Sequence, residues 1–139
     1  MHIDAQGLEI LDREECLRLL ATVPLGRVVF TDKALPAIQP VIFGLDDDRI
    51  VLRTSPGAKL ALATRGSVVA FEADSFDPGT RAGWSVTLIG EARPITDPAA
   101  LARAARLAID TWTPGPRDHY VEITGRIVSG RRIVGALCS

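Results

Sequence analysis

The stretch LGRVVFTDKALPAIQPVIFGLDDDRIVLRTSPGAK, residues 25–59, contains three strand signals in a row. Gly26–Thr31 and Arg49–Thr54 are rich in β-branched residues, and a longer apolar run, Leu35–Leu45, lies between them. The acidic triplet Asp46–Asp48 is typical of a turn, so the second and third runs read as a hairpin. The stretch therefore predicts an antiparallel sheet whose strands follow one another along the chain.

Three helices are predicted around this sheet. Asp12 is the expected N-cap of the first helix, which ends at Pro24. Ser55 is the expected N-cap of the second, with Pro56 at its first helical position. Asp97, followed by proline, begins the third helix by the same reasoning.

The remaining sequence predicts four more strands. Ser67–Ala73 and Gly83–Ala92 are separated by a predicted loop, Asp74–Ala82, and His119–Thr124 and Arg126–Val134 complete the set. Six or seven short strands in mostly meander order close most naturally into a small, mainly antiparallel barrel with peripheral helices.

Length and composition limit the classes of protein. The 139 residues suit a single domain, 1–139, and 47% hydrophobic with 24% charged residues is ordinary globular composition. A formal net charge of −1 argues against a dedicated nucleic-acid-binding protein. The apolar runs are too short to span a membrane, and no signal peptide is recognisable. Two cysteines, Cys16 and Cys138, make no disulfide framework, so we expect a cytoplasmic protein.

The segment from Arg53 to Lys59 combines features that bind an anion. A strand ends in Arg53, the hydroxyl groups of Thr54 and Ser55 follow, and Lys59 is expected in the first turn of a helix. Helix N-termini favour negative charge, and Gly57 would let an anion approach the backbone. The segment suits a phosphate monoester. The alternative is a plain helix cap with two solvated basic side chains.

Other chemistry has weaker support in the sequence. Walker, GxGxxG and HExxH motifs are absent, and with two histidines in the chain no metal site is expected. A triad of Ser85, His119 and Asp118 lacks the nucleophile-elbow motif. Trp84 and Trp112 each adjoin a loop and could stack on a flat ring, or could be partly buried at the rim of the core. His119 could donate to a ring carbonyl or cap a strand.

Taken in order, these segments resemble the pyridoxamine 5'-phosphate oxidase-like, flavin-binding split barrels, in particular their nitroimidazole-resistance-like branch. The likeness extends from about residue 10 to about residue 133. It rests on the order and spacing of several segments rather than on one specific motif. These segments are residues 25–30, 36–43, 50–59, 71–77, 83–86 and 112–120.

The resemblance implies a fold, an assembly and a cofactor. The fold is a mainly β, six-stranded antiparallel split β-barrel with flanking helices. The assembly is a homodimer with FMN in two equivalent clefts at the subunit interface. By resemblance, Arg53, Thr54, Ser55 and Lys59 hold the flavin phosphate. Gln39, Pro40 and Val41 line the isoalloxazine, Trp84 and Ser85 approach it from the partner subunit, and Trp112 and His119 close the pocket.

The leading functional hypothesis is an FMN-dependent oxidoreductase that reduces a small flat acceptor such as a nitroaromatic compound or a quinone. Flavin supplies its own redox chemistry, which agrees with the lack of a nucleophile or an acid–base pair. The alternatives are a split barrel that binds a deazaflavin, or haem with His119 as ligand, a non-catalytic flavin-binding or sensing module, and an interaction domain without a ligand. Pyridoxamine-phosphate oxidase activity itself is disfavoured, because the chain is short and shows no second phosphate site.

Overall fold

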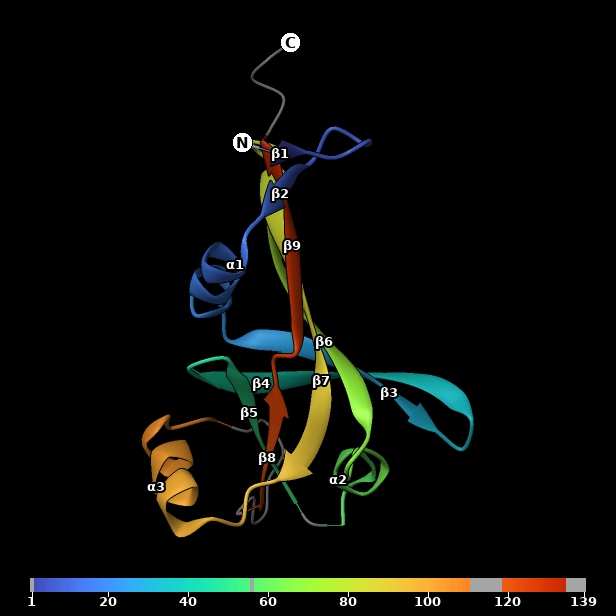
Figure 1. The fold of residues 1–139 in the computed structure, drawn as a ribbon, viewed down its shortest axis with the longest axis vertical. Coiled ribbons are helices and arrows are strands. Elements are labelled where there is room, and N and C mark those ends of the chain that lie inside the picture. Colours follow the sequence, from blue (N-terminus) through green and yellow to red (C-terminus); the bar gives the residue numbers. More distant parts are fainter. Residues whose placement is uncertain (1, 56, 111–118, 135–139) are drawn as a thin grey trace.

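The computed structural model describes residues 2–55, 57–110 and 119–134. In these residues nine strands and three short helices form (Figure 1). The strands are β1 (His2–Ile3), β2 (Glu9–Leu11), β3 (Leu25–Asp32), β4 (Leu35–Asp46), β5 (Arg49–Thr54), β6 (Val68–Asp77), β7 (Ala82–Pro94), β8 (His119–Thr124) and β9 (Ile127–Val134). The helices are α1 (Arg13–Leu20), α2 (Lys59–Ala63) and α3 (Pro98–Arg106).

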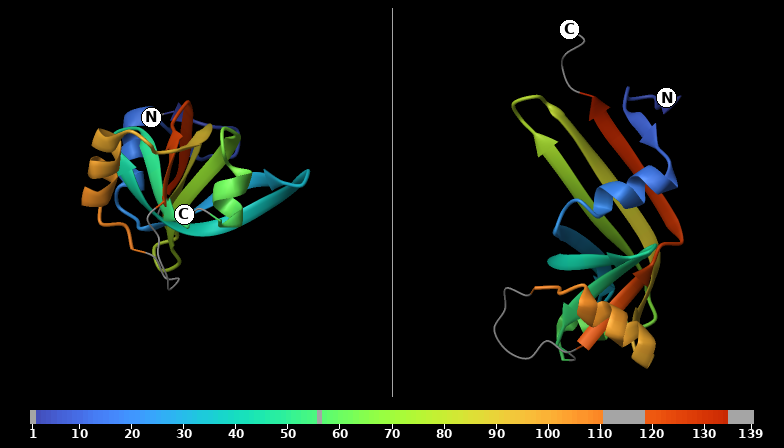
Figure 2. Two further views of the ribbon diagram at one scale, coloured as in Figure 1. Left: turned by 90° about the horizontal axis from the view of Figure 1, so that it is seen from below. Right: turned by 90° about the vertical axis from the view of Figure 1, so that its left-hand side faces the viewer.

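Six of these strands close into a barrel. The sheet runs in the order β6-β3-β4-β5-β8, and β7 completes the ring because it pairs with both β6 and β8. Every pairing in the ring is antiparallel. Figure 2 shows the closed end of the barrel from below. The predicted six-stranded antiparallel barrel is confirmed.

An arm extends from the barrel because β7 changes partners along its length. Its last residues, Ala92–Pro94, pair with β8, whereas Ala82–Ile89 pair with β9. The arm therefore consists of the upper parts of β6 and β7 with β9, and β2 and β1 extend it (Figure 1). Gly90 lies where the partners change, and a Cβ atom added there would overlap the carbonyl oxygen of Thr124. Glycine is required at this position by the close approach of two backbones.

Alternate residues of the strands fill the barrel interior, because successive side chains of a strand point to opposite faces of the sheet. Phe71, Leu52 and Ile123 are fully or almost fully buried. Phe43 packs edge-on against Phe71, with ring centroids 4.7 Å apart. A smaller buried cluster lies beneath α3, and it comprises Val51, Ile95, Ala104 and Ile109.

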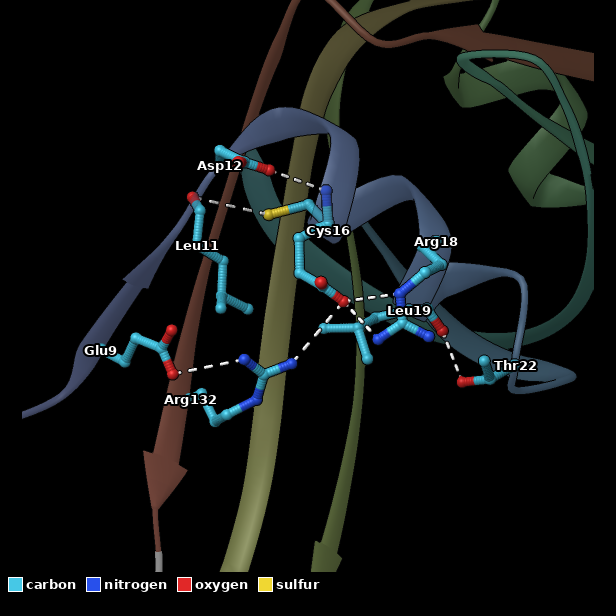
Figure 3. A network of polar contacts seen from close by, with 9 residues as sticks. Glu9, Leu11, Asp12, Cys16, Arg18, Leu19, Thr22 and Arg132 are labelled. Carbon is cyan, nitrogen blue, oxygen red and sulfur yellow. Dashed lines mark hydrogen bonds and ion pairs between the residues drawn. The ribbon is translucent and has the colours of Figure 1, made fainter. Parts of the chain in front are cut away.

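Helix α1 begins at the predicted cap and packs on the arm. The Asp12 carboxylate accepts the backbone N–H of Glu15 at 2.8 Å. The Glu15 side chain does not complete a capping box but contacts Arg18 and Arg132. Arg132 also contacts Glu9 at 3.2 Å (Figure 3), so one guanidinium group on β9 connects β2 and α1. The helical period predicts an apolar stripe of Cys16, Leu17, Leu20 and Ala21, which is only partly correct. The helix buries Cys16, Leu19 and Leu20, whereas Ala21 is exposed.

The predicted start of the second helix is wrong. Helix α2 begins at Lys59, and its cap, Ala58, makes no side-chain hydrogen bond. The carbonyl oxygen of Ser55 instead accepts the N–H of Ala58 at 3.1 Å, so the chain makes a turn before the helix begins. Pro56 lies outside the described residues. A five-residue helix contributes little dipole, so anion binding here depends on the charged side chains.

The predicted loop Asp74–Ala82 is wrong as well. Strand β6 continues to Asp77 and β7 starts at Ala82, with a tight turn closed by the N–H of Arg81 and the carbonyl of Asp77 at 2.7 Å. Pairs such as Ser75 with Trp84 extend the hairpin into the arm. Most side chains here are exposed, so the alternation that marks a half-buried strand is absent from the sequence.

The helical period predicts that Leu101, Ala104, Ala105 and Ala108 share the apolar face of the third helix, which is only partly correct. Ala104 is buried and Leu101 is half-buried, but Ala105 and Ala108 are exposed. The helix ends at Arg106, so Ala108 is no longer part of the helix and the helical spacing does not apply to it.

No helix in the described residues is both long and apolar enough to cross a membrane.

Candidate functional site

The end of β5 brings several predicted site residues together. Strand register places Arg53 opposite Tyr120 and Thr54 opposite His119. Arg53 is exposed, whereas Thr54 is 8% exposed and belongs to the inward-facing series of β5. Arg53, Thr54 and His119 therefore lie near one another at one end of the barrel.

The guanidinium group of Arg53 is held by the chain that follows α3. Its Nη1 donates a hydrogen bond to the carbonyl oxygen of Ile109 at 3.3 Å. Ile109 is itself buried in the cluster beneath α3. This contact gives an otherwise flexible side chain a fixed position at the barrel end, which lowers the entropy cost of binding an anion there.

Lys59 lies at the start of α2 and has a carboxylate partner. Its Nζ lies 3.0 Å from Oδ2 of Asp32, at the end of β3. The lysine side chain is 66% exposed and the aspartate side chain 23% exposed. Asp32 would compete with an incoming anion for Lys59. The local sequence around Lys59 did not indicate Asp32, because the two residues meet only through the fold.

The predicted ring-lining residues lie on β4 beside β3. Gln39 is half-buried, Pro40 is exposed and Val41 is buried in the core. Pro40 lies opposite Arg27 on β3, whereas the pairing of β4 with β5 begins at Phe43. Because a proline lacks the ladder donor, the sequence predicts an edge or a bulge at Pro40. Pro40 does lie in a part of β4 that pairs with β3 alone.

Trp84 and Ser85 lie on the arm, in the part of β7 that pairs with β9. This part of β7 is at the opposite end of the molecule from α2 (Figure 1). Trp84 lines two hollows, one of about 410 Å³ that also includes Arg132 and one of about 370 Å³ that also includes Ser85. A single chain therefore does not bring Trp84 and Ser85 next to Lys59.

A polar cluster on the outward face of the sheet did not emerge from the sequence. Nη1 of Arg27 lies 3.0 Å from Oε1 of Glu72 and 3.4 Å from Oδ2 of Asp74. The hydroxyl of Ser85 donates to Oε2 of Glu72 at 3.1 Å. We call these four residues the Arg27 cluster. They come from three strands, and only the register between strands could have revealed their contact.

The pKa of Glu72 reflects its position in the Arg27 cluster. Burial raises this pKa, and the neighbouring Asp74 carboxylate raises it further. The hydrogen bond from Ser85 and the charge of Arg27 lower it, but only in part. Two carboxylates therefore share one guanidinium group in a partly desolvated place.

Two other predictions, the closure of the pocket by Trp112 and the Ser85–His119–Asp118 triad, gain no support from the structure. Trp112 and Asp118 lie outside the described residues, so the predicted closure of the pocket by Trp112 stays a prediction. Ser85 hydrogen-bonds with Glu72 on the arm, and His119 lies at the start of β8, which gives no support to a triad. Within the described part of the chain, no group of three His, Cys, Asp or Glu residues could hold a metal ion.

Comparisons with known proteins match nearly the whole chain. A sequence model of the pyridoxamine 5'-phosphate oxidase family matches residues 12–132. The uncharacterized protein Rv0080 of Mycobacterium tuberculosis is 48% identical over 129 residues, which are 89% of this chain and 84% of that protein. The FAD binding protein from Mycobacterium smegmatis is 37% identical, has a TM-score of 0.79 and is matched over 90% of this chain and 97% of its own.

A more distant structure shares the fold. A 5-nitroimidazole antibiotic resistance-like protein from Bacteroides thetaiotaomicron has a TM-score of 0.72 at 15% identity, over 95% of this chain and 94% of its own. The barrel and the arm are both included in these matches. The arrangement of strands around Arg53, Pro40 and Trp84 is therefore shared with other proteins.

Proposed function

The chain belongs to the pyridoxamine 5'-phosphate oxidase family, and from that premise we propose that it is an FMN-binding oxidoreductase. The observation that carries this proposal is the placing of Arg53 and Lys59 at the end of the barrel, where β5 ends and α2 begins. A bound flavin supplies hydride or electron transfer to a small flat acceptor, such as a nitroaromatic compound or a quinone. The protein binds and orients the flavin.

The residues at this end of the barrel suit a phosphate monoester, the group that ends FMN. Arg53 offers planar N–H donors, Lys59 a mobile positive charge and Ser55 a hydroxyl group. Asp32 reduces the local positive charge by one unit. Because the relative from M. smegmatis binds FAD, the choice between FMN and FAD is part of the test.

The separation of Pro40 and Ser85 supports a site shared by two subunits. Both residues lie on the outward face of the sheet, and β3 and β6 lie between their strands. Three strand spacings of about 4.8 Å place them about 14 Å apart across the sheet. A flavin ring lying on Pro40 would thus be out of reach of Ser85 in the same chain. Ser85 of the partner subunit would complete the site in a homodimer.

The first test is the visible spectrum of the purified protein, followed by titration of the flavin-free protein with FMN, FAD and riboflavin. We expect Arg53→Ala with Lys59→Ala to weaken FMN binding about 100-fold, because two charged phosphate contacts are lost and one is partly screened by solvent. The matched control is Arg65→Ala with Arg106→Ala, which removes the same charge from two exposed sites.

Riboflavin separates the phosphate contacts from the ring contacts, since it lacks the phosphate. Its affinity should be equal in the wild type and in both double variants. Unchanged FMN affinity in the Arg53/Lys59 variant would defeat the phosphate assignment. A flavin-loaded protein that oxidises no reduced nicotinamide in the presence of a quinone or a nitroaromatic acceptor would defeat the oxidoreductase assignment.

A further inference from the structure

Trp84 and Ser85 are neighbours on β7, and their side chains lie on opposite faces of the sheet, because successive residues of a strand alternate. Ser85 lies on the outward face, where its hydroxyl group contacts Glu72. Trp84 packs against the main buried core cluster on the other face. Arg132, opposite Trp84 in register, contacts Glu15 of α1 on this second face. A ring that lies on Ser85 is therefore separated from the indole by the sheet.

A hollow of about 410 Å³ lies beside Trp84. We call it the Trp84 hollow. The residues whose side chains share the face of Trp84 form two neighbouring rows across β6, β7 and β9. They are Ser75, Trp84 and Arg132 in one row and Asp77, Ala82 and Val134 in the next. The volume is within the range of small-molecule pockets, about 300–1,000 Å³.

The lining of the Trp84 hollow suits a flat ring. The indole of Trp84 offers a broad face for stacking. Ala82 beside it is small, so space remains next to the indole, and Val134 adds apolar surface that is 46% exposed. Thr80, in the turn between β6 and β7, also lines the hollow. Its hydroxyl group accepts the N–H of Ala82 at 3.3 Å and can donate its own proton to an oxygen of a ligand.

The charged groups around the hollow argue against an anionic ligand. Nη1 of Arg132 lies 3.2 Å from a carboxylate oxygen of Glu9 (Figure 3), and Nη2 lies 3.6 Å from one of Glu15. The charge of Arg132 is thus compensated within the fold. The Asp77 carboxylate accepts the N–H of Gly79 at 2.8 Å. Among the described residues that line the hollow, an anion would meet one carboxylate and no uncompensated cation.

We propose that the Trp84 hollow is a second binding site, separate from the flavin site, which takes an uncharged flat ring that carries a carbonyl oxygen. The ring stacks on the indole of Trp84, and its oxygen accepts a hydrogen bond from Thr80. The site lies on the opposite face of the sheet from Pro40 and Ser85, which are proposed to contact the flavin. This inference goes beyond the proposed function and does not depend on it.

Coumarin is a suitable probe, because it is flat, uncharged and carries a carbonyl oxygen. Coumarin-3-carboxylate adds one negative charge to the same ring. Isothermal titration of the flavin-free protein should show that coumarin binds and that the carboxylate binds about tenfold or more weakly, because it meets Asp77. Equal affinity for the two compounds would overturn the charge argument. Absence of coumarin binding to the wild type would overturn the inference as a whole.

Variants of the two faces locate the bound ring. Trp84→Leu removes the stacking surface and Ala82→Leu fills the hollow, so each should weaken coumarin binding about fivefold or more. The matched control is Phe76→Leu, which removes an aromatic side chain from the outward face, where Phe76 is 56% exposed and lines a hollow with Ser85. Its coumarin affinity should equal that of the wild type. Equal affinity in all three variants would mean that coumarin binds elsewhere.

Flavin titration separates this site from the proposed function. Thermal melting establishes that each variant is folded, and Ala82→Leu keeps the test decisive if Trp84→Leu loses stability, because it leaves the core contact of the indole in place. FMN affinity should be the same in Ala82→Leu and the wild type, and saturation with FMN should leave coumarin binding unchanged. Displacement of coumarin by FMN would place both in one site and overturn the inference. A protein that binds coumarin but no flavin supports this site and defeats the proposed function.

Discussion

Single residues determine how strongly the barrel end can attract an anion. Lys59 is 3.0 Å from Asp32, so its charge is already partly compensated within the fold. Arg53 donates a hydrogen bond to the carbonyl of Ile109, which positions its guanidinium group at the barrel end. The two cations therefore differ: Arg53 is the positioned donor, and Lys59 is the one whose availability Asp32 controls.

Asp32→Asn should therefore strengthen FMN binding about two- to fivefold, because the competing carboxylate is removed and exposed ion pairs contribute up to about 1 kcal/mol. Fluorescence titration measures the change. Riboflavin affinity should stay constant, since riboflavin carries no phosphate. A loss of FMN affinity would instead mean that Asp32 positions Lys59 for the phosphate.

Residues whose predicted role depends on local spacing could be identified from the sequence. Contacts between residues far apart in the chain could not. Arg53 and Lys59 are visible from the pattern at the end of one strand. Asp32 is 27 positions before Lys59, and Glu72 is 45 positions after Arg27. Such partners depend on strand register, which one sequence without its pairing does not reveal.

At the scale of elements, strands with buried apolar residues were predictable and exposed ones were not. The bounds of β5 agree with the prediction, because its β-branched and apolar residues Ile50–Leu52 are all buried. Strands β1 and β2 were missed, since they are two and three residues long and form only by pairing with each other and with β9. The distal parts of β6 and β7 were missed because their side chains lie on the exposed arm.

The change of partners along β7 depends on one glycine. Gly90→Ala should destabilise the fold by about 3 kcal/mol or more, because its Cβ would overlap the Thr124 carbonyl and both backbones would have to move. Gly57→Ala is the matched control: its Cβ would meet nothing within 4 Å, and its stability should change by less than about 0.5 kcal/mol. Urea denaturation compares the two. Equal stability of both variants would show that the strands can separate at Gly90 without cost.

At the scale of the whole molecule, the outward face of the sheet brings together ionisable groups from different strands. Glu72 is faced by Arg27 from β3 and by Ser85 from β7, with Asp74 on its own strand. The pKa of Glu72 already lies above its ordinary value of 4.5 because of burial and of Asp74. The folded chain therefore holds a proton on Glu72 more readily than the unfolded chain does.

Stability should therefore depend on pH. The folded chain, in which the pKa of Glu72 is raised, binds more protons than the unfolded chain, so folding is favoured as pH falls through this pKa and the free energy of unfolding decreases as pH rises above the ordinary value. Glu72→Gln should remove most of this dependence when urea denaturation is compared at several pH values. A pH dependence equal in both proteins would assign it to another group.

The continuity of β7 has a mechanical consequence. One unbroken strand of 13 residues belongs to the barrel at one end and to the arm at the other. The strand is paired with β6 on both sides of Gly90, so no unpaired segment separates the arm from the barrel. A displacement of the arm would therefore pass along β7 to β8, which pairs with β5 beside Arg53.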